Sequence, residues 1–70
     1  MNTFRNTFTV RFGHSKRPGI PFTSETREFG NASAASRFRN RYLADAKIRG
    51  DISAFAIAEK SIDGERAVEI

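Results

Sequence analysis

Basic side chains are the residues of this sequence whose number and spacing point to a chemical role. Lys and Arg number 12 against eight Asp and Glu, which gives a formal net charge of +4 at pH 7. Ten of the bases but only three of the acids fall within residues 1–49. A surface of this kind attracts acidic partners, among them nucleic acids and acidic protein patches.

Six of these bases form the candidate binding surface. They lie on the polar side of a predicted helix, in a predicted first loop and on the outward face of a first strand: Arg37, Arg41, Lys47, Lys16, Arg17 and Arg11. Such side chains neutralise phosphates without a preformed pocket. We therefore expect contact with nucleic acid or a nucleoprotein complex. The alternatives are an acidic surface of a protein partner, or a solvated surface with no specific role.

Residues suited to catalysis or metal binding are sparse. His14 is the only histidine and cysteine is absent, so no transition-metal site is predicted. The carboxylates lie on strands whose charged faces keep an edge from aggregating. Residues 13–19 contain two glycines but lack the ending of a phosphate-binding loop. We expect a protein that is not an enzyme, with no cofactor, metal or small-molecule substrate, and His14 as an exposed loop residue.

The bases of the helix belong to residues 31–50, the longest regular segment of the chain. At 100° per residue, Phe38 and Tyr42 fall on an apolar arc, which predicts that they anchor the helix to a sheet. Asn31 or Ser33 can serve as the N-cap, and Gly50 suits the left-handed position after the last turn. Arg39 falls within the apolar arc, so we expect its stem to cover apolar surface while its guanidinium reaches water. The alternatives are a partly buried arginine held by a sheet carboxylate, or one exposed at a binding surface.

Two extended segments are predicted before the helix. Residues 4–12 alternate polar and apolar side chains, which is typical of a strand with one buried face. Residues 13–19 predict a turn or loop, and residues 20–29 predict an irregular edge strand with a bulge. All the Phe side chains are predicted to face the core, which leaves no pair of surface aromatics for stacking on bases.

A hairpin is predicted after the helix, because Asp63-Gly64 between extended runs is a strong signal for a two-residue turn. This turn would pair Ile62 with Glu65 and Glu59 with Val68. One apolar face then contains Phe55, Ile57, Val68 and Ile70. The alanines at positions 54, 56 and 58 fall on the other face, where they either face solvent or form a contact patch or a second, tight packing surface.

The predicted order is strand, strand, helix, strand, strand. It corresponds to the α+β class: residues 1–70 form a single domain with a sheet of about four strands and one helix packed across one face. The absence of cysteine and of long apolar runs predicts a soluble, cytoplasmic protein with no membrane partner. Its size and architecture are typical of small phage and mobile-element proteins, which act by binding. An inhibitor or adaptor of a host protein is the alternative function.

Overall fold

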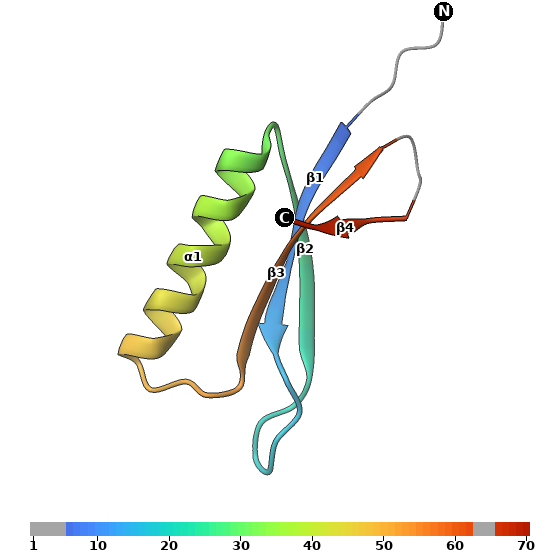
Figure 1. Ribbon diagram of the computed structural model, residues 1–70. Helices are drawn as coiled ribbons and strands as arrows, with labels where there is room; N and C mark the ends of the chain where they lie inside the picture. Colours follow the sequence, from blue (N-terminus) through green and yellow to red (C-terminus); the bar gives the residue numbers. More distant parts are fainter. Residues whose placement is uncertain (1–5, 63–65) are drawn as a thin grey trace, which may run out of the picture.

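A four-stranded antiparallel sheet with one helix across one face forms the fold (Figure 1). The computed structural model describes residues 6–62 and 66–70. Its elements in chain order are β1 (Asn6–His14), β2 (Thr23–Phe29), α1 (Ala32–Ile48), β3 (Ala54–Ile62) and β4 (Val68–Glu69). The strands lie in the order β2-β1-β3-β4. The α+β class and the element order predicted from the sequence are therefore confirmed.

Both ends of α1 form as the sequence predicts. The side-chain oxygen of Asn31 accepts a hydrogen bond of 2.8 Å from the Ala34 amide, as an N-cap does. Gly50 has a φ of +72°, and its amide donates to the Lys47 carbonyl over 3.1 Å. A residue with a Cβ is strained in this left-handed conformation, so glycine suits the helix end.

The hydrophobic core lies between α1 and one face of the sheet. Its buried residues are Val10, Phe12, Ala35 and Ala58. The ring of Phe12 lies 5.0 Å from that of Phe38 and 5.1 Å from that of Tyr42, centroid to centroid. The prediction that these two helix residues anchor α1 to the sheet is consistent with these contacts.

The face of β3 that packs on the helix is the alanine face, contrary to the prediction from the sequence. Val10 lies opposite Ala58 and Phe12 opposite Ala56, so the alanines share the helix side with the core residues of β1. Phe55 and its neighbours of the same parity lie on the sheet face that α1 does not cover. Small side chains let the helix approach closely, and rings from β1 and α1 supply the bulk that β3 lacks.

The register between β3 and β4 also differs by one residue from the prediction. Glu59 pairs with Glu69 and Lys60 with Val68, whereas the sequence predicted that Glu59 pairs with Val68. A shift of one residue moves every side chain of a strand to the other face. Val68 therefore lies on the helix side, and it is exposed. The predicted turn, at positions 63 and 64, lies outside the described residues.

The ladder between β1 and β2 is regular, so the predicted bulge is absent from it. Seven consecutive pairs run from Phe8 opposite Phe29 to His14 opposite Thr23. β2 lies at the edge of the sheet, as predicted. β1 continues through Gly13 and His14, which the sequence assigned to a loop. A Cβ at Gly13 would collide with the backbone carbonyl of Thr23, so the pairing here requires glycine.

The turn between β1 and β2 is centred on Pro18 and Gly19. Arg17 and Ile20 exchange two backbone hydrogen bonds of 3.0 and 2.8 Å on either side of it. Gly19 has a φ of +80°, and proline followed by such a glycine is the usual sequence of a type II turn. The hairpin therefore extends beyond the ladder and holds Lys16 and Arg17 at its tip.

Candidate nucleic-acid interface

The six predicted binding residues are all exposed, but they lie on different surfaces of the molecule. Arg11 lies on the face of the sheet that α1 leaves uncovered, because its neighbours in the strand, Val10 and Phe12, face the core. Arg37 and Arg41 lie on α1, which covers the opposite face (Figure 1). The structure therefore separates these two helix residues from Arg11.

Lys47 instead comes to the same end of the molecule as the hairpin tip. The chain leaves α1 and enters β3 beside the end of β1, where the Ser15 amide donates to the Ser53 carbonyl over 2.7 Å. Four bases gather on the segments that meet here: Lys16, Arg17, Lys47 and Arg49. We call these four residues the basic end. Arg49, the C-cap of α1, was not among the predicted site residues.

A hydrogen-bonded network around Asp51 joins the two segments of the basic end. The ring Nε2 of His14 lies 2.7 Å from Oδ2 of Asp51, and its Nδ1 lies 3.2 Å from the Thr23 hydroxyl. Oδ1 of Asp51 accepts from the hydroxyl and the amide of Ser53, over 2.8 and 3.1 Å. His14 is thus a half-buried link between β1 and the loop after α1, whereas the sequence predicted an exposed loop residue.

The charge of Asp51 is stabilised by this network. The hydrogen bond from the Ser53 hydroxyl is the main reason that the pKa of Asp51 lies below its ordinary value of 3.8, and His14 and the Ser53 amide act in the same direction. Partial burial opposes them. An ionised carboxylate only accepts hydrogen bonds, so Nε2 of His14 is the donor in its hydrogen bond to Oδ2 of Asp51.

The bases of the candidate surface have no acidic partner in the described part of the chain. The contact between His14 and Asp51 is the only contact of a basic with an acidic side chain within ion-pair distance among residues 6–62 and 66–70. Arg11 and the basic end are therefore exposed bases that form no ion pair with a described residue. Two other arginines are engaged: the Arg27 guanidinium lies 5.0 Å from the ring centroid of Phe38, and Nη1 of Arg39 donates to the Ile70 carbonyl over 2.9 Å.

Charge changes sign along the uncovered face of the sheet. Arg11 lies between Thr26 and Ile57 in the register, on the half next to the basic end. The next row of the same face, away from the basic end, crosses Thr9 and contains three carboxylates: Glu28, Glu59 and Glu69. An anionic ligand on this face is therefore favoured beside Arg11 and disfavoured one row further.

An aromatic pair, formed by the exposed Phe22 and the half-buried Phe55, lies on the same half of the uncovered face as Arg11. The rings of Phe22 and Phe55 are nearly parallel, with an interplanar angle of 12° and a centroid separation of 6.2 Å. Phe22 is 62% exposed. The prediction that all the Phe side chains face the core is wrong for this pair. The pairing of β1 with β3, which the sequence alone does not reveal, decides which face Phe55 occupies.

A hollow of about 440 Å³ surrounds this pair. Its lining combines apolar, hydroxyl and cationic groups: Arg11, Ser15, Phe22, Ser24, Phe55 and Ile57. Gly13 lies between Ser24 and Phe55 in the register and adds no side chain to the row. The hollow can therefore hold a flat apolar group beside a positive charge.

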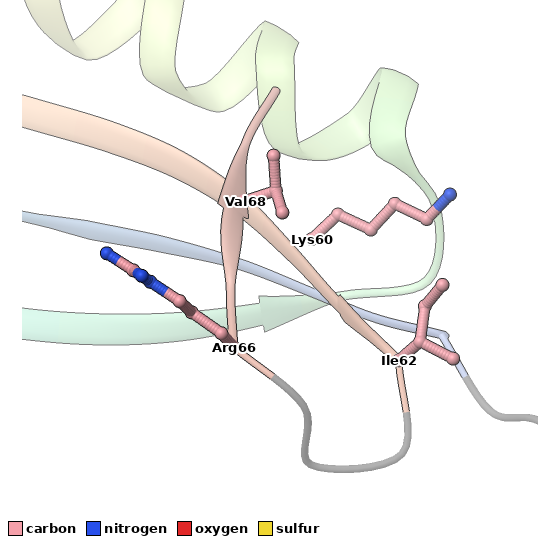
Figure 2. A pocket seen from close by; sticks show the side chains of 4 residues that line it. All are labelled: Lys60, Ile62, Arg66 and Val68. Atoms are coloured by element: carbon pink, nitrogen blue, oxygen red, sulfur yellow. The ribbon is translucent and has the colours of Figure 1, made fainter.

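A second hollow, of about 290 Å³, lies on the β3–β4 hairpin and is lined by Lys60, Ile62, Arg66 and Val68. Figure 2 shows Lys60, Ile62 and Val68 pointing to the side of the sheet where α1 lies, with Arg66 turned away from them. No ring lines it. It therefore lacks the aromatic surface that the hollow around Phe22 provides.

Within the described residues, no group of three or more His, Cys, Asp or Glu is placed to hold a metal ion. No helix in the same part of the chain is long and apolar enough to cross a membrane.

Comparison with known proteins gives no relative: no family model, no curated protein and no solved structure matches this chain.

Proposed function

We propose that this protein is a non-enzymatic module that binds nucleic acid through its basic end and the adjoining half of the uncovered sheet face. The observation that carries the proposal is the set of exposed bases, Arg11 and the basic end, that form no ion pair with a described residue and lie beside the aromatic pair of Phe22 and Phe55. Exposed bases attract the phosphate backbone, and nearby rings provide a surface for bases. The protein would act in the cytoplasm as a small accessory protein of a phage or mobile element.

Salt dependence of binding tests this proposal. If Arg11 and the basic end supply about five phosphate contacts, log K falls with log salt with a slope of about −3.5 on a single strand. Raising the salt from about 50 to about 200 mM then weakens binding by about 100-fold. Fluorescence anisotropy with labelled DNA and RNA at both salt concentrations measures this change. Absence of binding even at the lower concentration would refute the proposal.

Two double charge reversals locate the binding surface. The hairpin variant carries Lys16→Glu and Arg17→Glu, and the helix variant carries Arg37→Glu and Arg41→Glu. Each replaces two exposed bases by two acids and takes the net charge from +4 to zero, so the two are matched in overall electrostatics. The hairpin variant should lose at least tenfold more affinity than the helix variant. Equal losses would mean that net charge alone drives binding.

The helix residues remain the competing location. If Arg37 and Arg41 form the site, the helix variant should instead lose more affinity than the hairpin variant. Both variants should fold, because exposed charge reversals change stability by about 0.5 to 1 kcal/mol. Circular dichroism and melting curves check this.

An acidic surface of a protein partner is the second candidate, in which case the protein is an inhibitor or adaptor. The observation that favours it is apolar exposure near the basic end: Ile48 is 84% exposed and Ile52 is 76% exposed. Apolar side chains rimmed by charge are common in protein interfaces. A pull-down from cell extract with and without nuclease separates the two candidates. Partners that survive nuclease favour a protein, and partners lost with nuclease favour nucleic acid.

A further inference from the structure

The uncovered half-face around Phe22 and Phe55 has the features of a stacking site. Phe22 lies after the type II turn and outside the β1–β2 ladder, and most of its ring is in contact with solvent. Contact of such an apolar ring with water costs free energy. A ligand that covers the ring would recover this free energy. Phe55, in β3, supports Phe22 with a nearly parallel ring.

The groups around the pair match the parts of a nucleotide. Arg11 provides a cation on the same face, and the hydroxyls of Ser15 and Ser24 line the hollow. Lys16 precedes the turn that leads to Phe22 and is exposed, so it adds positive charge to the tip of the same hairpin. A base therefore finds a ring to stack on, and its phosphate finds a guanidinium nearby.

We propose that this half-face binds single-stranded nucleic acid by stacking unpaired bases on Phe22 and Phe55. The inference rests on the proposed nucleic-acid function and names the class of ligand. In a duplex each base face is covered by its neighbours, so a protein ring reaches it only where the strand is open. The row of Glu28, Glu59 and Glu69 repels phosphates and confines the strand to the half of the face beside Arg11.

Removal of the exposed ring tests the inference. Anisotropy titrations would use one labelled oligonucleotide as a single strand and the same sequence as a duplex. The single strand should bind more tightly, and Phe22→Ala should weaken it about fivefold or more, with little effect on duplex binding. Phe22→Trp should restore or increase the affinity, because its ring is larger. The salt dependence should not change in either variant, since the ring contacts no phosphate.

The outcomes distinguish this inference from the proposed function. If the single strand and the duplex bind equally and Phe22→Ala changes neither, the protein binds nucleic acid through phosphates alone and the stacking inference is wrong. If neither nucleic acid binds, the proposed function itself fails. Phe55→Leu is a second test inside the fold: it keeps apolar bulk but removes the ring, and it should weaken single-strand binding while its melting curve shows a folded protein.

Discussion

Replacement of Phe38 by alanine should remove a large part of the stability of this fold. The Phe38 ring packs against the rings of Phe12, Phe29 and Tyr42. The guanidinium of Arg27 lies over it. The centroid of the Phe38 ring lies 5.0 Å from that of Phe12 and 5.3 Å from that of Phe29. Truncation of a core Phe costs about 3 to 5 kcal/mol of unfolding free energy. Because Phe38 is partly exposed, we expect the cost of Phe38→Ala to be near the lower value.

In a domain of this size, about 3 kcal/mol corresponds to a fall of about 12 °C or more in melting temperature. Thermal and urea unfolding followed by circular dichroism would measure it. Phe22→Ala is the matched control, because it removes the same side chain from an exposed position with one aromatic partner and should cost about 1 kcal/mol or less. Equal destabilisation by the two variants would contradict the assignment of Phe38 to the core and Phe22 to the surface.

Three further predictions concern local features of the fold. The pKa of Asp51 is lowered mainly by Ser53, so its contribution to stability is complete well above the ordinary value of 3.8 and is lost as the pH falls below 3.8 and through the lowered pKa; urea unfolding from about pH 6 down to about pH 2 should show this loss of stability, and Asp51→Asn should make the loss smaller. Asn31→Ala removes the N-cap acceptor and should cost about 1 kcal/mol in the same assay, and a neutral result would contradict the cap. Gly13→Ala places a Cβ against the Thr23 carbonyl and should cost about 1 to 3 kcal/mol, so an unchanged melting temperature would show that the strand is not as close here as the structure has it.

Local signals in the sequence were sufficient for the helix and for the order of elements. Asn31 and Gly50 lie at the two ends of α1 in the structure, as predicted, because capping depends on residues within one turn of the helix end. The positions of Phe38 and Tyr42 on the packed side follow from the helical period alone. These features need no knowledge of which strands become neighbours.

The faces of the sheet could not be predicted in the same way. Phe55 and Ala56 alternate whichever way β3 faces, and only the pairing with β1 and the position of α1 decide which of them is buried. The sequence rule that large apolar side chains face the core chose the wrong side. The same error hid the aromatic pair, so the candidate site predicted from charge lacked its apolar part.

The sequence likewise could not predict that the segments of the basic end lie at the same end of the molecule. Lys16 and Lys47 are far apart in the chain, and the contact between His14 and Asp51 that joins their segments spans 37 positions. A lone histidine with no nearby carboxylate in the sequence gave no indication of this link. Exposure of all six predicted bases, in contrast, follows from their charge.

The most direct test of the proposed site is a map of backbone amide shifts in the ¹H–¹⁵N NMR spectrum when a short single-stranded oligonucleotide is added at low salt. The largest changes should fall on residues around the aromatic pair and the hairpin tip: Arg11, Gly13, Ser15, Lys16, Phe22 and Phe55. Changes confined to Arg37, Arg41 and the outward side of α1, or no changes at all, would contradict the site on the uncovered sheet face.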